Sequence, residues 1–378
     1  MRDPGMPPRI VHVVYSLEVG GLENGVVNLI NGLRDEFRHA VVCVGQSGVL
    51  QEGLPSGVDV VTVGRGSARD RWVALRLARV FRALRPTIVH SRNWPAIEAI
   101  PAARLAGVPL VIHGEHGREA ADPEGRDRRR NRIRRLLAPW VDRFVAVSAD
   151  LRRWLAGTVG VPEGKLVTIC NGVDTHRFRP GECAAARHGL GLVEDHPVVG
   201  TVGRLDPVKD QAGLLEAFAR VKGAHPEAVL LIAGDGPCRG ELEARAAVLG
   251  LGPGVRFLGE TKEVPAVLRS LDVFVLPSIA EGISNTVLEA MATGLPVVAT
   301  RVGGNPELVE EDVTGALIPP REPAALAAAI GGYLGEPARR FAHGAAGRRR
   351  ALERFDLAGM VSAYRELYLG LARGKALL

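Results

Sequence analysis

The sequence is poor in lysine, aromatic residues and cysteine, and it has no long apolar run. Only five of its 48 basic residues are lysines, and phenylalanine, tyrosine and tryptophan together make up 4% of its 378 residues. Cys43, Cys170, Cys183 and Cys238 are far apart and form no C-x-x-C pair. Their spacing argues against a structural zinc site or a disulfide framework and favours reduced thiols. No segment approaches the ~18 consecutive apolar residues that a membrane-spanning helix requires.

The start of the chain and its overall charge argue against further classes of protein. The first 16 residues lack the continuous apolar core of a signal peptide, so we expect a cytoplasmic protein. The net charge of +6 is modest for this length and does not predict a nucleic-acid partner. With 46% hydrophobic and 24% charged residues, the composition is that of a globular protein and excludes a disordered or fibrous one. A chain of 378 residues exceeds what one hydrophobic core usually sustains, so two domains are expected.

Short apolar, β-branched runs alternate with helical patterns along the whole chain, which predicts parallel sheets buried on both faces. In the first half, strands are expected at 9–15, 40–44, 58–63, 87–90, 109–113, 143–147 and 166–169, and helices at 22–33, 71–84, 96–106 and 128–137. The pattern begins again near residue 197, with strands expected at 198–203, 228–233, 255–258, 273–276, 296–299 and 316–318. Helices of this second half are expected at 212–221, 241–249, 264–270, 287–292, 323–334, 338–354 and 357–371.

The segment 174–197 separates the two halves. It has no clean period and contains Pro180, Gly181 and Gly189, so we interpret it as the connection between two doubly wound α/β domains. The expected domains are residues 1–182 and 183–355, followed by a helical segment, 356–378, that returns to the first domain. Ligands of open α/β sheets bind beyond the carboxyl ends of the strands, so we expect a cleft between the facing domains, with the motifs just after strands.

Two of these motifs join a predicted strand to a helix. Gly20 and Gly21 follow the first strand, where a glycine pair lets the backbone approach a ligand and points free N–H groups at an anion. An ordinary strand-to-helix turn is the alternative. Arg204 and Lys209 follow the strand at 198–203. The guanidinium as a fork and the ammonium as a compact charge could both reach a diphosphate, and solvated surface charge is the alternative.

A third motif follows the predicted strand at 273–276. Glu281 is expected in the loop and Glu289 two turns into the next helix. The backbone N–H groups at the start of that helix would face a phosphate; they belong to Gly282, Ile283, Ser284, Asn285 and Thr286. A loop carboxylate can hydrogen-bond sugar hydroxyls, and one further along can hold a ribose diol. Acids placed to complement the helix dipole would explain Glu281 but not the spacing of the two carboxylates.

Together these motifs resemble the retaining GT-B glycosyltransferases of family 4. The resemblance rests on Glu281-x7-Glu289, Arg204 with Lys209, the glycine pair, the turn at 233–237 that includes Gly234, and the run at 171–174. It covers nearly the whole chain in the right order. The runs at 12–17, 20–25 and 113–118 are similar to the sugar transferases associated with exosortase/PEP-CTERM exopolysaccharide clusters. The resemblance implies the GT-B fold, in which two Rossmann-like domains face a central cleft.

The resemblance also implies roles for individual residues. Arg204 and Lys209 would neutralise the departing donor diphosphate, Glu281 would contact the donor sugar and Glu289 would bind the ribose. The amides of Ile283, Ser284 and Asn285 would cradle sugar and phosphate, with Ser284 standing where the family usually has a second glycine. His116 would lie near the 6-position of the transferred sugar, and Gly20 and Gly21 beside donor and acceptor. Without the resemblance, a hydrogen-bonded structural histidine is an equally good interpretation of His116.

The sequence predicts neither a metal site nor a cofactor. It contains no H-x-x-x-H pair that a helix would present to a metal. It also has no Asp-x-Asp, the usual carboxylate pair for the metal of a nucleotide sugar. We therefore expect a metal-independent reaction in which Arg204 and Lys209 supply the positive charge.

Seven arginines fall within ten residues of the first half. They are Arg126, Arg128, Arg129, Arg130, Arg132, Arg134 and Arg135. A GC-rich coding sequence explains an excess of arginine over lysine, and the preference of arginine for phosphate and carboxylate groups is the alternative. A helical basic face could rest on anionic lipid at the inner face of the plasma membrane, and a plain solvated helix explains the pattern equally well. We expect no nucleic-acid partner, because no recognition fold or aromatic platform accompanies the arginines.

These observations lead to one function and two alternatives. We predict a hexosyltransferase that moves a sugar from a UDP- or GDP-sugar to a hydroxyl of a saccharide or lipid-linked acceptor, in exopolysaccharide or cell-envelope synthesis, with retention of anomeric configuration. A non-catalytic regulator built on the GT-B scaffold is the first alternative. A dinucleotide-dependent oxidoreductase is the second, but its best support, the run 234–240, has the spacing G-x-G-x-x-x-G rather than G-x-G-x-x-G.

Overall fold

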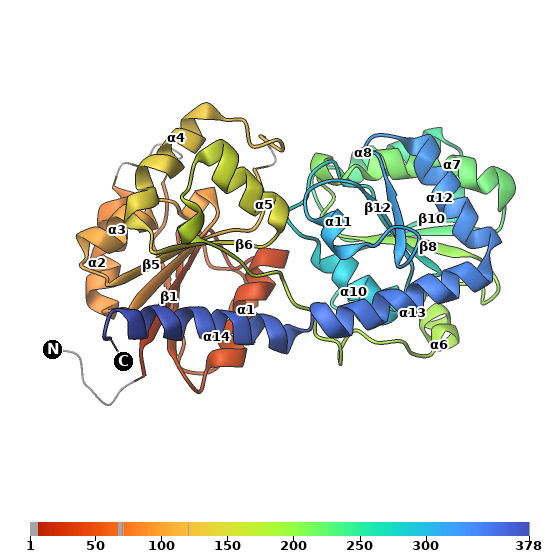
Figure 1. Ribbon diagram of the computed structural model, residues 1–378. Coiled ribbons are helices and arrows are strands. Elements are labelled where there is room, and N and C mark those ends of the chain that lie inside the picture. The colour runs from red at the N-terminus through yellow and green to blue at the C-terminus, as the bar shows by residue number, and fades with distance from the viewer. Residues whose placement is uncertain (1–6, 67–69, 71, 120, 378) are drawn as a thin grey trace. The chain divides into compact units, whose positions relative to one another are not determined.

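The computed structural model describes residues 7–66, 70, 72–119 and 121–377, which form two compact units (Figure 1). The first unit contains residues up to Gly172 together with Leu357–Leu378, and the second contains Val173–Asp356. Each unit is built around one sheet in which every neighbouring pair of strands is parallel. Helices separate successive strands, so the prediction of two doubly wound α/β domains is confirmed.

The first sheet has seven strands in the order β3-β2-β1-β4-β5-β6-β7. They are β1 (Arg9–Val14), β2 (Arg38–Cys43), β3 (Asp59–Thr62), β4 (Ile88–Arg92), β5 (Leu110–Glu115), β6 (Arg143–Ala146) and β7 (Leu166–Thr168). The helices of this unit are α1 (Gly21–Leu33), α2 (Val73–Leu84), α3 (Ala99–Leu105), α4 (Arg128–Leu137), α5 (Ala149–Trp154) and α14 (Leu357–Gly374). The strand order reverses between β1 and β4, which places the switch point of the sheet there.

The second sheet has six strands in the order β10-β9-β8-β11-β12-β13. They are β8 (Val198–Val202), β9 (Val229–Ala233), β10 (Val255–Gly259), β11 (Val273–Leu276), β12 (Val297–Thr300) and β13 (Gly315–Ile318). The helices are α6 (Cys183–Gly189), α7 (Gln211–Ala224), α8 (Arg239–Val248), α9 (Val264–Arg269), α10 (Asn285–Thr293), α11 (Asn305–Leu308), α12 (Pro323–Gly335) and α13 (Pro337–Arg354). Here the order reverses between β8 and β11.

The core of the first unit shows why its last helix belongs there. One face of the sheet is covered by α1 and by α14, which contact each other (Figure 1). In α14, Tyr364, Tyr368 and Ala372 recur every four residues, which places them on one face of the helix, and all three are buried. Buried side chains of β1, β4 and β5 pack against these two helices.

The segment between the two halves is more ordered than the sequence analysis expected. Residues 183–189 form α6, where Arg187 is buried, pairs with Asp272 at 2.7 Å and donates to the Ser270 carbonyl. A short helix anchored by a buried arginine has no apolar period, which is why the pattern concealed it. The change of unit lies at Gly172–Val173, whereas the sequence analysis placed the domain boundary after residue 182. Residues just after it contact the second unit: the Arg177 side chain, for instance, donates to the Lys262 carbonyl.

Candidate functional site

The candidate site of the second unit lies on loops at the carboxyl ends of β8, β11 and β12. These are adjacent strands, and β8 and β11 flank the point where the strand order reverses. The β8 loop carries Lys209 and the β11 loop carries Glu281, so two residues 72 positions apart in the sequence come from neighbouring strands. Open α/β sheets bind their ligands at this position.

Lys209 and Glu281 form an ion pair. The Lys209 ammonium lies 2.5 Å from the Glu281 Oε1 atom, and the Ser278 hydroxyl donates to the same oxygen at 2.7 Å. The Glu281 side chain is 8% exposed and that of Lys209 is 26% exposed, so the carboxylate is held inside while the ammonium remains accessible. Partial burial strengthens such a charge-assisted hydrogen bond relative to a surface pair.

Backbone bonds hold the two loops in register. The Asp206 carboxylate accepts the Val208 N–H and caps a short 3₁₀ turn that ends at Lys209. The Ile279 N–H then donates to the Val208 carbonyl at 2.8 Å, which ties the β11 loop to the β8 loop. On the other side, the Thr300 hydroxyl of β12 donates to the Ser278 carbonyl at 2.5 Å. These bonds hold in place the two loop backbones that carry Lys209 and Glu281.

Arg204 lies in the same loop but does not join the ion pair. Its side chain is 67% exposed and pairs with Asp206 at 3.0 Å. Its carbonyl accepts the side-chain amide of Gln211. The structure therefore brings Lys209 and Glu281 together and leaves the Arg204 guanidinium at the surface.

The glycine-containing segment after Glu281 leads into α10, which begins at Asn285. The Ser284 hydroxyl accepts the Val287 N–H at 3.3 Å and also contacts the Thr286 hydroxyl, so Ser284 is the N-cap of the helix. Ser284 therefore has a structural reason to replace the glycine that the family pattern usually carries. Gly282 and Ile283 are buried, and the Gly282 carbonyl accepts the Gly304 N–H at 3.0 Å.

Gly303 packs directly on this segment. Its φ is +53°, and a Cβ added to it would lie 1.8 Å from the Glu281 carbonyl oxygen. Only glycine fits, for both backbone conformation and space. Gly303 was not predicted as a site residue, because the pair Gly303-Gly304 resembles an ordinary loop in sequence and its role depends on β11 and β12 being neighbours.

Glu289 occupies the second turn of α10 and differs from Glu281 in its environment. Burial raises the pKa of Glu289 to about 7, and the positive charge of Arg177 offsets this only in part. Glu289 was expected two turns into the helix, whereas α10 begins at Asn285 and Glu289 lies about one turn in. A half-buried carboxyl with a raised pKa is typical of a functional position rather than of a surface acid.

The turn after β9 packs against the β8 loop. Gly234 has a φ of +130°, and a Cβ there would lie 2.0 Å from the Gly203 carbonyl oxygen. Gly236 likewise packs against the Leu205 carbonyl, while the Leu205 N–H donates to the Asp235 carbonyl. These glycines allow two loop backbones to touch, which accounts for the run that otherwise supported a dinucleotide site.

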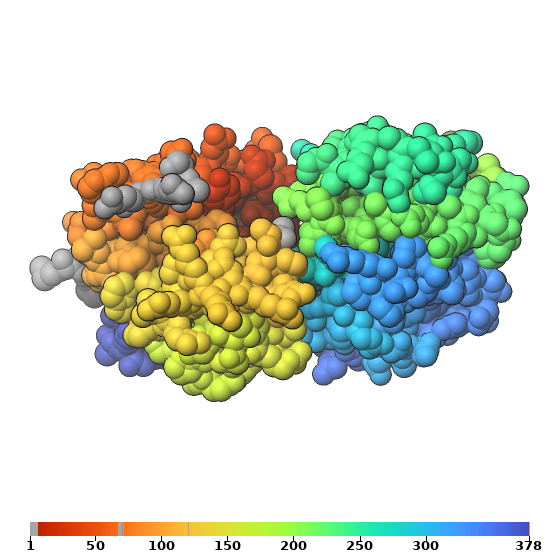
Figure 2. Space-filling view, turned by 90° about the horizontal axis from the view of Figure 1, so that it is seen from above, coloured from red at the N-terminus to blue at the C-terminus, as the bar shows by residue number. Residues whose placement is uncertain are grey.

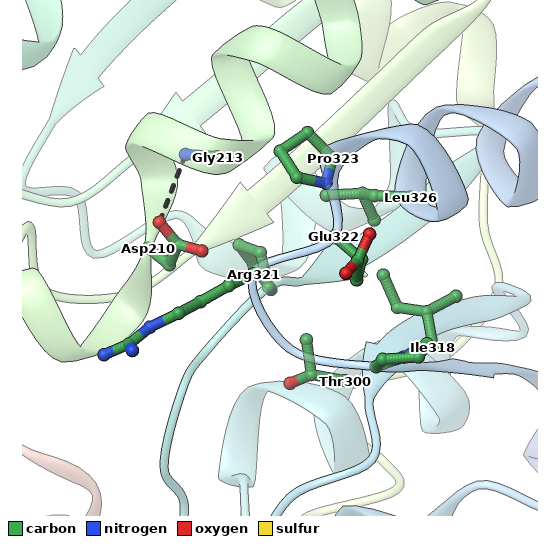
Figure 3. Close-up of a pocket in the computed structure, with 10 residues that line it drawn as sticks. Asp210, Gly213, Thr300, Ile318, Arg321, Glu322, Pro323 and Leu326 are labelled. Atoms are coloured by element: carbon green, nitrogen blue, oxygen red, sulfur yellow. Dashed lines mark hydrogen bonds between the residues drawn. The ribbon is translucent and has the colours of Figure 1, made fainter.

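A small hollow lies close to this site, beside the first residues of α7 (Figure 3). It has a volume of about 10 Å³, which is room for one water molecule. The Asp210 carboxylate accepts the Gly213 N–H there, as the dashed line in Figure 3 marks. Thr300 and the loop after β13 close it, so it is a packing gap rather than a sugar pocket.

In the first unit, Gly20 and Gly21 form the turn between β1 and α1. Gly20 has extended backbone and its carbonyl accepts the Asn24 N–H at 3.0 Å. The Glu23 carboxylate lies where a Cβ on Gly20 would stand, at 2.2 Å, so the glycine leaves room for that side chain. The turn is at least partly exposed.

His116 follows β5 in the same unit, and both its ring nitrogens are buried without a hydrogen-bond partner among the described atoms. The backbone N–H of His116 donates a hydrogen bond to the Asn93 Oδ1 atom at 2.7 Å. Burial, with the nearby charge of Arg92, lowers the pKa of His116 to about 3, so the ring is neutral at physiological pH. The imidazole is therefore not the hydrogen-bonded structural histidine that was the alternative interpretation.

A buried polar cluster that was not predicted from the sequence lies beside His116. Arg92 at the end of β4 is buried, and its guanidinium contacts His12 and His90. His90 also bonds the Tyr368 hydroxyl of α14 at 2.8 Å. An arginine in a sequence is normally interpreted as an exposed residue, so Arg92 alone does not indicate a buried cluster. The only indication in the sequence is that several neighbouring strands each carry a histidine.

The arginine-rich segment forms α4, in which some arginines are exposed and Arg134 is part of the core. Arg134 is buried, bonds Glu115 at 2.6 Å and Glu119 at 2.7 Å, and lies over the rings of two tryptophans, Trp94 and Trp154. Burial alone would raise the pKa of Glu115, but Arg134 and His113 lower it to about 2. The remaining arginines divide into paired and unpaired groups, as described below.

The described part of the chain has neither a metal-binding cluster nor a membrane-spanning helix. No three or more histidine, cysteine, aspartate or glutamate side chains come together there in a group able to hold a metal ion. Among the helices described, none combines the length and apolar character needed to cross a bilayer.

Comparison with known proteins matches both halves of the chain. A family model described as "Glycosyl transferases group 1" matches residues 196–336, and one described as "Glycosyltransferase Family 4" matches residues 19–177. The chain is 35% identical over 289 residues to a GDP-mannose-dependent alpha-(1-6)-phosphatidylinositol monomannoside mannosyltransferase of Mycolicibacterium smegmatis, covering 70% of this chain and 73% of that protein. It is 32% identical over 323 residues to a glycogen synthase of Mycobacterium tuberculosis, covering 83% and 76%. The crystal structure of Anabaena HepE in complex with UDP-glucose matches with a TM-score of 0.83 at 23% identity, over 98% of this chain and all of that one.

Proposed function

Since the chain belongs to the group 1 glycosyl transferases of glycosyltransferase family 4, with the GT-B fold, we propose that it transfers a hexose from a UDP- or GDP-sugar to an acceptor hydroxyl with retention of anomeric configuration. The name of the mycobacterial relative supports a GDP-sugar, and the complex of HepE with UDP-glucose supports a UDP-sugar. The two relatives act on different acceptors by their names, a phosphatidylinositol mannoside and glycogen, so the acceptor is a separate question.

The observation that carries the proposal is the Lys209–Glu281 ion pair at the carboxyl ends of β8 and β11. Glu281 neutralises the accessible Lys209 ammonium. A donor diphosphate would pair with the Lys209 ammonium in competition with Glu281. The Glu281 carboxylate would then be available to the hydroxyls of the donor sugar. Lys209 would stabilise the negative charge of the departing diphosphate, and exposed Arg204, which pairs with Asp206 of its own loop, could turn towards it.

The other predicted residues complete the proposed donor site. Glu289 would accept hydrogen bonds from the ribose, and the amides of Ile283, Ser284 and Asn285 would face sugar and phosphate at the start of α10. Gly282, Thr286 and Gly234 would shape the surrounding loops. From the first unit, neutral His116 would contact the transferred sugar near its 6-position, and Gly20 and Gly21 would border donor and acceptor. Catalysis would then consist of positioning and charge stabilisation, with the acceptor attacking from the face that the diphosphate leaves.

We propose that the reaction needs no metal ion and no cofactor, because Lys209 and Arg204 can supply the positive charge near the diphosphate. A chelator tests this directly. The rate of sugar transfer should be the same with and without EDTA, and a loss that Mg²⁺ or Mn²⁺ restores would contradict the proposal. The anomeric configuration of the product, followed by NMR, tests retention in the same reaction.

For the acceptor, we propose a saccharide or lipid-linked sugar in exopolysaccharide or cell-envelope synthesis at the cytoplasmic side of the membrane. The resemblance to the exosortase/PEP-CTERM transferases supports this. Thermal-shift measurements with UDP-, GDP- and ADP-sugars would identify the donor, because a ligand at 100 times its Kd adds about 2.7 kcal/mol of stability. Donor binding without any transfer or hydrolysis would favour the non-catalytic regulator.

A further inference from the structure

One flank of the first unit is basic and partly apolar. It consists of α2, α3, α4 and the 3₁₀ turn Ala138–Trp140, which follow one another along that side (Figure 1). These four elements contain ten arginines and no aspartate or glutamate. We call this flank the α2–α4 surface.

The structure divides the arginines of this surface into two groups. Arg134 and Arg130 pair with Glu119, Arg76 pairs with Asp70 and Arg104 pairs with Asp142. The other six are exposed, and no ion pair joins them to a carboxylate within the described residues. These are Arg79, Arg82, Arg128, Arg129, Arg132 and Arg135. The nearby acids are thus engaged by the inner arginines, and the outer six leave an uncompensated positive charge.

Large apolar side chains share the surface with these cations. Along α4, Arg128, Arg132 and Leu136 recur every four residues and form one stripe, which Trp140 continues. Leu136 is 68% exposed and Trp140 is 48% exposed. Trp72, which is 65% exposed, and Leu75 lie on the same face of α2 as Arg79 and Arg82.

Hydrogen bonds between the elements join these stripes into one continuous surface. The Arg82 side chain of α2 donates to the Leu105 carbonyl at the end of α3, and Leu105 is itself exposed. The Arg104 side chain donates to the Trp140 carbonyl. In the space-filling view, the yellow residues of α4 lie at the surface beside the orange residues of α2 and α3 (Figure 2).

We propose that the α2–α4 surface docks on a membrane leaflet that contains anionic lipid. The unpaired arginines would contact phosphate groups of the headgroups, while the tryptophans and leucines would enter the interface, where amphipathic aromatic side chains are favoured. A nucleic acid would use the cations but would leave Leu136 in water, so the combination favours lipid. This surface extends the proposed function, to which it would bring a lipid-linked acceptor, yet vesicle binding itself requires no catalysis.

Sedimentation of the full chain with vesicles tests the proposal. Binding is expected to vesicles of phosphatidylcholine with phosphatidylglycerol and not to phosphatidylcholine alone, and it should weaken as salt rises. Replacing Arg128, Arg129 and Arg132 by glutamine should weaken binding on the order of 100-fold, since each cation near such a surface contributes about fivefold. Arg135 is left in place because its side chain holds the carbonyls of 158 and 159.

The matched control removes the same charge from the second unit. Arg220, Arg349 and Arg354 are exposed and have no carboxylate partner among the described residues, so their triple glutamine variant should bind vesicles within about twofold of the wild type. A second pair of variants tests the apolar part. Leu136→Ala with Trp140→Ala should weaken binding without removing its salt dependence, whereas the exposed pair Val248→Ala with Phe341→Ala should not.

Three results would overturn the proposal. The first is equal binding of the wild type to neutral and anionic vesicles, or no binding to either. The second is full binding by the Arg128, Arg129 and Arg132 variant. The third is loss of DNA or RNA binding in that variant with no vesicle binding by the wild type, which would assign the surface to nucleic acid. Transfer to a soluble acceptor should be unchanged in the variant, so failure of the proposed activity would show separately from failure of docking.

Discussion

Replacing Glu289 with glutamine is expected to stabilise the second unit and to weaken binding of the nucleotide sugar. Burial raises the pKa of this carboxyl from its usual 4.5 to about 7. Between these two values the folded protein keeps a proton that the unfolded chain has lost, so the free energy of unfolding falls as pH rises. At 1.36 kcal/mol per pKa unit, the loss reaches about 3 kcal/mol above pH 7. Glutamine cannot ionise, so the variant does not lose this stability as the pH rises.

The expected stability difference therefore depends on pH. Below pH 4.5 the variant and the wild type should unfold at the same urea concentration, and at pH 8 the variant should be more stable by up to about 3 kcal/mol. Far-UV circular dichroism follows both units, whereas tryptophan fluorescence reports only on the first, because all four tryptophans lie there. Fluorescence should not distinguish the two proteins.

The same substitution removes the proposed partner of the ribose. Hydrogen bonds to a charged group contribute ~1.5–3 kcal/mol, so the Kd for the donor should rise at least about tenfold. A variant that is less stable than the wild type at pH 8, or a stability difference that does not change with pH, would refute the account of the buried carboxylate. Stabilisation with unchanged donor binding would refute only its role at the ribose.

Three further substitutions test the structure around the site. Replacing Arg134 with leucine leaves the buried Glu115 carboxylate with only the His113 ring as partner, while Glu119 keeps Arg130, and should cost the first unit about 3–5 kcal/mol in urea unfolding followed by tryptophan fluorescence. Gly303→Ala forces a Cβ towards the Glu281 carbonyl and should lower kcat at least about tenfold, whereas Gly164→Ala, with open space around it, should leave kcat unchanged. Ser278→Ala removes one donor to Glu281 and should lower kcat roughly tenfold without unfolding the chain, and wild-type kcat would contradict a positioning role.

The fold was predictable because both sheets are parallel and buried on both faces. Such strands form short apolar runs that sequence displays directly, and α4 occupies the predicted residues 128–137. The elements that escaped prediction are short. α6 depends on buried Arg187 and the four-residue α11 on tertiary packing, and neither has an apolar period long enough to detect.

The candidate site was predictable residue by residue but not as an arrangement. Lys209 and Glu281 were each expected after a strand, yet their ion pair follows from β8 and β11 being neighbours, which single motifs do not encode. Arg204 was expected to act beside Lys209, which stays a prediction, and its pair with Asp206 was not foreseen. The clustered arginines were expected to be solvated or to face lipid, and the burial of Arg134 escaped prediction because the acids that neutralise it lie elsewhere in the sequence.

The central claim is that Lys209 and Glu281 act together in nucleotide-sugar transfer. Its most direct test is the initial rate of sugar release from the donor identified by thermal shift, measured for Lys209→Ala, Glu281→Ala and the exposed control Arg220→Ala. Losing either member should abolish measurable turnover while circular dichroism shows an intact fold, and the control should match the wild type. Turnover close to the wild type in both site variants would contradict the account.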